Sequence, residues 1–367
     1  VNFSSVTSRR LMLAVVVSAV LVASAPFLGE ARSQLRRAFP EEFSLIVNGA
    51  VGGMLLAAAA YGLSRIRERR WLRYAGMVVA LAIGAGYDAV TGSADPNVRA
   101  VERIHFVQFG LIALLFYRAW RERRDWSALA LPLMAAFIVR TAEEAYQWFI
   151  PARVGELRDV WLNGVAIACG LLFASGLEPP VPFTFGWRPG SLRAVARMLA
   201  IVVLALAAFV HTVHLGREIH DPDIGVFDTR FTLEELAAES ADRIERWKHD
   251  PPMTRPARLS REDQYATEGL QHVQARNSAW DRGDVKTAWR ENLILEKYYQ
   301  PVLDSPSYVS KTGHRWHPDH RADAEARATG TAGESFTSRA YPYPLYYWPP
   351  WALWLVAGLA AGGLLLI

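Results

Sequence analysis

The sequence predicts an all-α protein: a polytopic bundle of about eight transmembrane helices, with a helical extracytoplasmic domain between the last two spans. Three observations support this fold class. Of the 367 residues, 51% are hydrophobic, and the mean hydropathy is +0.08, as in a membrane protein with a soluble part. Apolar stretches long enough to cross a bilayer, roughly 20 residues each, recur along the chain. The polar stretch 217–344 separates the last two of them.

The apolar stretches predict the helices in order. They cover residues 11–29, 44–64, 72–91, 103–120, 128–149, 158–177, 194–215 and 345–367. The first follows Arg9 and Arg10 and has features of a signal peptide, but more spans follow it, so we interpret it as an anchor. Three regions result: a bundle over 1–216, a domain over 217–344 and a C-terminal helix over 345–367. That helix has no basic stop after it, so we expect that the native chain can continue past Ile367.

Arginine placement predicts the orientation, because basic residues favour cytoplasmic loops. Four basic groups fall on one side of the membrane. They are Arg9 and Arg10, the segments 65–73 and 118–126, and the trio Arg188, Arg193 and Arg197. The loop 30–42 is the exception. We therefore expect a bacterial inner-membrane protein with a cytoplasmic N-terminus and an extracytoplasmic segment 217–344.

The charge balance excludes one class of partner. Residues 217–344 hold 18 basic and 22 acidic residues, so the net charge of +4 comes from the short loops of the bundle. Such a distribution does not indicate nucleic-acid binding. The aromatic segment 341–354 is expected at the outer membrane surface, where amphipathic rings are stable. The expected partners are the lipid bilayer and other integral membrane proteins.

Polar residues gather near the outer ends of the fourth, fifth and sixth apolar stretches. They are Glu102, His105, Arg140, Glu143, Glu144, Gln147, Arg153, Asp159 and Asn163. The spacing of Arg140, Glu143, Glu144 and Gln147 places them on one helical face. Ionisable groups at membrane depth normally face a bundle interior or a water-filled cavity. The sequence therefore predicts one polar cluster, open to the outer face, that forms either a pocket or an interhelical network.

The segments VERIHFVQFGLIALLFY and EEAYQWFIPARVGELRDVWLNGVAIACG, within residues 45–177, resemble the VanZ-like family of bacterial integral membrane proteins. The family pattern has an acid shortly before a His, then acid-acid-x-x-Gln, Arg, Asp, Asn and Gly. The matching positions are Glu102, His105, Glu143, Glu144, Gln147, Arg153, Asp159, Asn163 and Gly170. Two of the acids are Glu where the family pattern has Asp. The family name comes from low-level resistance to a glycopeptide antibiotic. The resemblance implies a membrane location and an outward-facing polar site, and it does not imply a reaction.

The polar cluster allows three interpretations. Paired acids beside a histidine can perform general acid–base chemistry, but neither a Ser or Cys nucleophile nor an HExxH motif accompanies them. A ligand pocket is the second interpretation. The third is a structural network in which Arg140 and Arg153 neutralise the acids while Gln147 and Asn163 join helices. We favour the network and predict no catalytic residue.

Two histidine groups are possible metal or pigment ligands. They are His211 with His214, and His314, His317 and His320 in HRWHPDH. Imidazoles three apart on a helix can bind a haem, a chlorophyll magnesium or a metal, but we favour an interfacial position for the first pair, where the chain leads into the extracytoplasmic domain. Pro318 disfavours a regular helix through the second group. We predict no cofactor. The single cysteine, Cys169, excludes an internal disulfide.

The extracytoplasmic segment is predicted to be helical. Thr232 and Glu235 form a capping-box pattern, and residues 261–304 predict two helices joined at DRGD. This hairpin resembles one tetratricopeptide-type unit, but a single unit cannot bury its own face, so a generic helical hairpin is favoured. We expect residues 321–340 to be a linker.

Two functional hypotheses follow. The first is a non-enzymatic accessory, scaffold or stabilising subunit of a larger membrane assembly. An energy-converting complex, photosynthetic or respiratory, would be one such assembly. No residue pattern in this chain identifies which assembly it is. The GxxxG pairs Gly49/Gly53 and Gly358/Gly362 would support helix packing, within this chain or against another. The alternative is an envelope protein that binds or modifies a lipid-linked precursor or a glycopeptide antibiotic through the polar pocket.

Overall fold

A computed structural model describes most of the chain. The described residues are 5–68, 70–150, 155–180, 182–250, 252, 261–307, 310–328 and 335–367. The chain divides into two compact units. The first contains Val1–Glu144, Glu156–Phe209 and Trp354–Ile367, and the second contains Ala145–Gly155 and Val210–Leu353.

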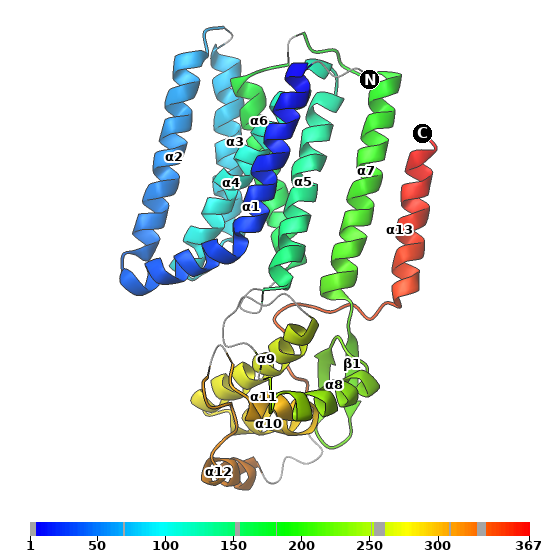
Figure 1. Cartoon of the computed structure of the whole chain (residues 1–367). Coiled ribbons are helices and arrows are strands. Elements are labelled where there is room, and N and C mark those ends of the chain that lie inside the picture. The colour runs from blue at the N-terminus through cyan, green and yellow to red at the C-terminus, as the bar shows by residue number, and fades with distance from the viewer. Residues whose placement is uncertain are drawn as a thin grey trace. The chain divides into compact units, whose positions relative to one another are not determined.

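Long helices build the first unit, and each predicted apolar stretch contains one (Figure 1), although the last helix begins at Pro350 and not at residue 345. The helices are α1 (Ser5–Ala38), α2 (Phe43–Arg65), α3 (Arg70–Thr91), α4 (Pro96–Trp120), α5 (Ser127–Trp148), α6 (Leu157–Leu177), α7 (Pro189–Phe209) and α13 (Pro350–Leu365). The last turn of α5 and the first turn of α13 belong to the second unit. The predicted all-α bundle of membrane-spanning type is therefore confirmed.

Six of these helices are long and apolar enough to cross a membrane: α1, α2, α3, α4, α6 and α7. Helix α5 has 22 residues but carries Arg140, Glu143 and Glu144. Helix α13 is strongly apolar but has only 16 residues. The number of about eight spans therefore stays a prediction, because α5 carries three charged residues and α13 is shorter than a usual span.

Helix α1 is longer than the sequence predicts. The expected loop 30–42 is wrong for most of its length, because the helix continues to Ala38. Pro26 lies inside the helix, and Figure 1 shows that the blue helix bends in its second half. Proline removes a backbone hydrogen bond and kinks a helix without ending it when good helix formers follow. The polar end of α1 therefore turns away from the direction of its apolar part.

The core of the first unit lies among α4, α5 and α6. Its buried side chains include Phe109, Ile112 and Phe116 of α4 and Ile167 of α6, and Ala14 of α1 joins them. Close packing of α4 against α6 depends on two glycines. A Cβ atom at Gly170 would lie only 2.3 Å from the Cα atom of Gly110. The two backbones can approach this closely because neither residue has a side chain.

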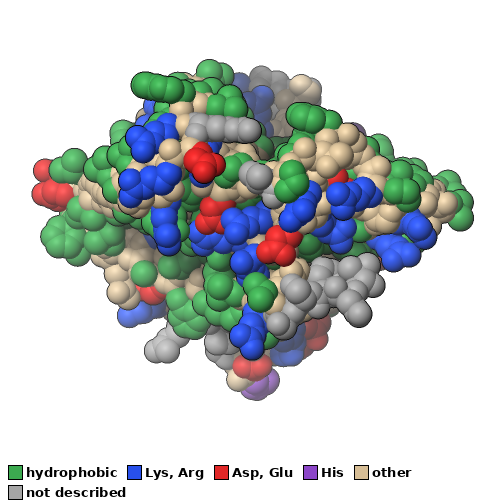
Figure 2. Space-filling view, turned by 90° about the horizontal axis from the view of Figure 1, so that it is seen from above, with side chains coloured by type: hydrophobic (Ala, Val, Ile, Leu, Met, Phe, Trp, Pro, Cys, Tyr) green, Lys and Arg blue, Asp and Glu red, His purple; other side chains and the backbone are tan. Residues whose placement is uncertain are grey.

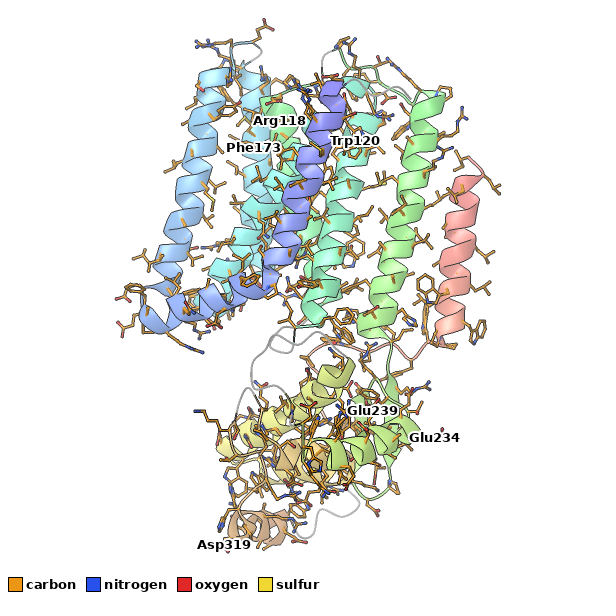
Figure 3. All side chains as sticks on the ribbon, viewed as in Figure 1. Arg118, Trp120, Phe173, Glu234, Glu239 and Asp319 are labelled. Carbon is orange, nitrogen blue, oxygen red and sulfur yellow. The ribbon has the colours of Figure 1, made fainter. Side chains whose placement is uncertain are left out.

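The basic clusters share one end of the first unit. Arg10 near the start of α1 donates to the carbonyl of Arg118 at the end of α4, at 3.3 Å. Arg118 also contacts Glu178, just after α6, at 2.6 Å, and Arg73 of α3 donates to the carbonyl of Gly176 at 2.8 Å. Figure 2 views this end, where Lys and Arg side chains are prominent, and Figure 3 labels Arg118 and Trp120 there.

The second unit combines a β-hairpin with short helices. Strands β1 (Arg217–Asp221) and β2 (Gly225–Thr229) pair antiparallel, with Ile219 opposite Phe227. The helices are α8 (Leu233–Arg246), α9 (Arg261–Asp281), α10 (Val285–Tyr298), α11 (Gln300–Asp304) and α12 (Pro318–Ala328). The hairpin was not predicted, although its Asp-Pro-Asp-Ile-Gly loop carries turn residues. Gly225 has a φ of 127°, which other residues rarely adopt.

Local sequence signals in the second unit are confirmed. Thr232 accepts from the Glu235 amide at 3.0 Å, and Glu235 accepts from the Thr232 amide at 2.9 Å, which completes the capping box. The DRGD turn separates α9 from α10, and its Gly283 has a φ of 76°. Asp284 caps α10 by accepting from the Thr287 amide at 3.2 Å. Side-chain capping of this kind is encoded within four residues.

Two expectations for the end of this unit are wrong. Pro318 does not exclude a helix: it is the first residue of α12, where its missing amide costs nothing. Residues 321–328, expected as part of a linker, continue that helix. Arg321 pairs with Glu325 at 3.0 Å and Arg327 with Asp323 at 3.2 Å, and such pairs four residues apart support a helix. Figure 3 labels Asp319 in the first turn of α12.

Candidate functional site: a buried polar cluster in the bundle

The centre of the predicted polar cluster is a buried ion network on α5. Arg140, Glu143 and Glu144 have exposed fractions of 1%, 3% and 0%. The Arg140 guanidinium pairs with both carboxylates, three and four residues further along the same helix. The side chains meet because residues at these spacings lie on one helical face. The cation is thus neutralised within its own helix.

Helix α4 contributes an aromatic surface to this network. The Arg140 Cζ atom lies 5.1 Å from the ring centroid of Phe109, a cation–π geometry. His105, one turn earlier on α4, stacks on the same residue with a centroid distance of 6.3 Å. Phe109 therefore joins the predicted histidine to the predicted arginine, a role that the sequence analysis did not assign.

The first turns of α6 complete the cluster. The Glu144 carboxylate accepts from the Glu156 amide at 3.0 Å, which connects α5 to the segment that begins α6. Asn163 is 1% exposed and donates through Nδ2 to the Asp159 carbonyl at 2.7 Å. The half-buried Asp159 is close enough to interact electrostatically with Arg140 and Glu144. The structure thus brings Arg140, Glu143, Glu144 and Asp159 together.

Among the residues that the structure describes, no hydrogen-bond partner is found for the buried Nε atom of Arg140, a donor, or for the buried Oδ1 atom of Asn163, an acceptor. A buried polar atom without a partner is costly and is often satisfied by an ordered water molecule or by a ligand. The described residues of the cluster therefore do not satisfy all of its hydrogen-bonding groups.

Other predicted members lie at the edge of the cluster or outside it. Glu102 accepts from the Ser93 amide at 3.1 Å and lies 3.9 Å from Arg158, so its described contacts are with the α3–α4 loop and the start of α6. Gln147 is buried in the last turn of α5, which belongs to the second unit. Arg153 lies outside the described residues.

A second charged network near the start of α4 was not predicted. Asp88 of α3 accepts from Arg99 and Arg103 of α4, with nitrogen–oxygen distances of 3.0 and 2.9 Å. Arg103 also donates to the side-chain oxygen of Asn48 on α2 at 2.9 Å. The network ties α2, α3 and α4 together. The one available signal was the spacing of Arg99 and Arg103, because their partners are 11 or more residues away in sequence.

The histidines are not brought to a common centre. His214 is buried, and its Nδ1 atom lies 3.0 Å from the Pro344 carbonyl, whereas the side chain of His211 is exposed. His314 contacts the Ser307 hydroxyl at 2.9 Å, and His317 contacts Asp319 at 3.3 Å. His320 instead stacks on Trp316. In the part of the chain that the structure describes, no three His, Cys, Asp or Glu residues are placed to hold a metal ion.

The GxxxG glycines face open space. A Cβ atom at Gly49, Gly53, Gly358 or Gly362 would meet no other atom within 4 Å. These glycines therefore do not bring two described helices of this chain into close contact, unlike Gly110 and Gly170. We expected these glycines to pack against a helix either of this chain or of another protein. The described helices give no support to packing within this chain.

Comparison with known proteins identifies one region. A family model described as VanZ/LLP1 matches residues 11–178. The match extends the resemblance seen at residues 45–177 to include most of α1, and it covers α2 to α6 with the whole polar cluster. Neither the curated proteins nor the solved structures contain a match to this chain.

Proposed function

The chain belongs to the VanZ-like family through residues 11–178, and from this premise we propose that it is a non-enzymatic accessory or stabilising subunit of a larger membrane assembly. The long apolar helices and the family together indicate a membrane protein. The role within an assembly goes beyond the family, because membership alone assigns no reaction and no partner.

One observation carries the proposal: the acids that could perform catalysis are already engaged. Glu143 and Glu144 both pair with Arg140, and Glu144 also accepts a backbone amide. A general acid or base must exchange its proton with a substrate, whereas the oxygens of these two carboxylates are turned toward a buried guanidinium of their own helix. Such contacts suit a network that holds helices in place.

The open glycine faces suggest where neighbouring helices pack. Gly49 and Gly53 lie one turn apart on α2, and nothing in the described chain fills the space beside them. In a bilayer, close helix packing is driven by small residues at such spacing. This proposal predicts that helices of other subunits pack against these glycines. An energy-converting complex, photosynthetic or respiratory, is one class of assembly that contains such helices.

We further propose that the protein lies in the bacterial inner membrane with its arginine-rich end in the cytoplasm. Basic residues near helix ends favour the cytoplasmic side. The chain leaves α7 at Phe209, the opposite end from Arg188, which immediately precedes the helix, and from Arg193, which lies near its start. Residues 217–344 are then extracytoplasmic.

The deciding experiment is purification of the tagged native protein in mild detergent, followed by the mass and absorption spectrum of what copurifies. We expect a stoichiometric complex, and a coloured one would indicate an energy-converting assembly. A G49L/G53L variant should lose the complex. A G76L/G86L variant is the matched control, because those glycines also face open space but do not share one helical face. A lone, colourless chain would overturn the proposal.

The alternative function has one observation in its favour: the Arg140 donor and the Asn163 acceptor have no hydrogen-bond partner in the described part of the chain. A lipid-linked precursor or a glycopeptide antibiotic carries amide groups that could satisfy both atoms. If the cluster binds such a ligand, Asn163→Leu should abolish binding measured by calorimetry while the protein stays folded. Unchanged binding, or no binding by the unsubstituted protein, would remove this alternative.

A further inference from the structure

The arginine-rich end of the first unit carries far more positive than negative charge. Its three segments, residues 65–73, 118–126 and 178–197, contain twelve arginines and four acids. Figure 2 shows this end, with basic side chains beside hydrophobic ones. Such an excess creates a positive potential that attracts anionic partners.

Three of the four acids at this end are already occupied. Glu178 pairs with Arg118 and Arg121, at 2.6 and 2.5 Å, and Glu122 pairs with Arg10 at 2.9 Å. Asp125 is buried and accepts from the Ser127 amide at 3.1 Å. Exposed arginines are therefore left without a carboxylate in the described part of the chain. They include Arg65, Arg67, Arg70, Arg124, Arg188 and Arg193.

Aromatic side chains stand beside these arginines. Trp71 is 89% exposed and Phe185 is 83% exposed. The loop that carries Phe185 is fixed: the Thr184 amide donates to the Arg124 carbonyl at 2.7 Å. Phe183 and Phe185 also pack edge-to-face against Trp126, with centroid distances of 5.2 and 6.0 Å. The exposure of these rings is thus a property of an ordered loop.

The surfaces next to the arginines are apolar. Leu72 at the start of α3 is 73% exposed, Leu63 near the end of α2 is 65% exposed, and Leu192 at the start of α7 is 40% exposed. A partner that fits must present a negative group against the arginines and an apolar body against the adjoining helices. An acidic soluble protein offers only the first of these features.

We propose that this end of the bundle is a binding surface for anionic phospholipids. The lipid phosphates contact the exposed arginines, whose planar guanidinium groups bind phosphate oxygens in pairs. The aromatic rings lie at headgroup level, where they are commonly found, and the acyl chains cover Leu63, Leu72 and Leu192. The inference is independent of the proposed assembly role, because it concerns the isolated chain and its lipids.

The test uses the purified full-length chain in a neutral detergent. Short-chain phosphatidylglycerol and phosphatidylcholine are titrated separately while the melting temperature is recorded. Phosphatidylglycerol should raise the melting temperature in a saturable manner, and phosphatidylcholine should not. Each arginine near an anionic surface contributes about fivefold in affinity, so R188Q/R193Q should weaken apparent binding by roughly tenfold or more. The control R36Q/R37Q removes the same charge from the last turn of α1 and should change binding by less than about twofold.

Several outcomes would overturn the proposal. Equal stabilisation by phosphatidylcholine would show that charge is not recognised, and equal weakening in both double variants would show that no particular surface is involved. Stabilisation by polyglutamate but not by phosphatidylglycerol would identify an acidic protein segment as the partner instead. If R188Q/R193Q has a lower melting temperature without lipid, R65Q/R70Q replaces it and is expected to weaken binding to the same degree.

Discussion

At the scale of single residues, Gly170 sets the distance between α4 and α6. A Cβ atom there would lie 2.3 Å from the Cα atom and 3.0 Å from the carbonyl oxygen of Gly110. The reverse substitution is easier, because a Cβ atom at Gly110 would lie 3.6 Å from the Cα atom of Gly170. The position identified by the family pattern is thus the one that tolerates no side chain.

This asymmetry gives a direct prediction. Gly170→Ala should destabilise the protein by about 1–3 kcal/mol, because two packed backbones must separate. Gly110→Ala should have little effect, since its methyl group meets only ordinary van der Waals contact. Thermal unfolding of both variants in detergent measures the difference. Equal melting temperatures would mean that α4 and α6 do not pack through these glycines.

Asp221, at the end of β1, is a residue whose charge stabilises the second unit. Its carboxylate accepts from the Lys297 ammonium and the Tyr298 hydroxyl, each at 2.6 Å, and from the Asp223 amide at 2.9 Å. Burial alone would raise the pKa of Asp221, but these hydrogen bonds lower it from 3.8 to about 2. The folded state therefore favours the charged carboxylate.

The pH dependence follows from that direction. Because the folded-state pKa lies below the unfolded value, the stabilisation is complete above about pH 4 and is lost as the pH falls from 3.8 to about 2. Asp221→Asn should remove this dependence and cost about 2 kcal/mol at neutral pH. Urea unfolding across that range is the measurement. Parallel pH profiles for the two proteins would contradict the assignment.

At the scale of elements, α9 presents an unusual buried face. Gln264, Glu268, His272 and Arg276 follow one another at intervals of four, and all are at most 5% exposed. Their partners come from the rest of the unit. His272 contacts Glu291 of α10 at 2.7 Å, and Glu268 accepts from the Tyr299 hydroxyl at 2.9 Å. Such a satisfied polar face specifies which helices α9 packs against.

Arg276 tests how much this face depends on side-chain shape. It donates to Asn292 at 3.0 Å and to the His314 carbonyl at 2.7 Å, and burial lowers its pKa to about 10. Lysine cannot reach both acceptors, so Arg276→Lys should cost about 2 kcal/mol. The exposed Arg282 provides the control, since Arg282→Lys should be neutral. Urea unfolding monitored by tryptophan fluorescence compares them, and equal midpoints would refute the role.

The elements also show what sequence reasoning can and cannot reach. Signals that act within one helix or turn were read correctly, such as the capping box at Thr232 and the spacing of Arg140, Glu143 and Glu144. The partners of Asp88 and the role of Phe109 were missed, because they depend on contacts between helices. The prediction at Pro318 was wrong, because a proline disrupts a helix when it lies in the interior but is well tolerated at the first position. The local sequence does not show which of these positions Pro318 occupies.

At the scale of the whole molecule, the arginine distribution predicts a topology. In a background without Cys169, a cysteine at Asp319 should react with a membrane-impermeant maleimide added outside the cell. Asp319 suits this test because its side chain is 94% exposed. A cysteine at the exposed Arg67 should react only after the membrane is permeabilised. The opposite pattern would mean that the protein is inverted relative to the proposal.

The ion network of α5 has a consequence for how the chain is made. A segment with three charged residues should enter the bilayer poorly from the translocon, because a charge within a span costs up to about 3 kcal/mol, the value at its centre. Arg140 finds its partners within its own helix, so most of this cost can be offset as soon as one turn forms, before α6 is synthesised. Exchanging Arg140 with Ala142 keeps the composition but places the arginine one and two residues before the acids, spacings at which side chains on a helix do not face each other. In a glycosylation-based insertion assay, that exchange should lower the inserted fraction of α5, whereas an unchanged fraction would mean that α5 depends on its neighbours to enter the membrane.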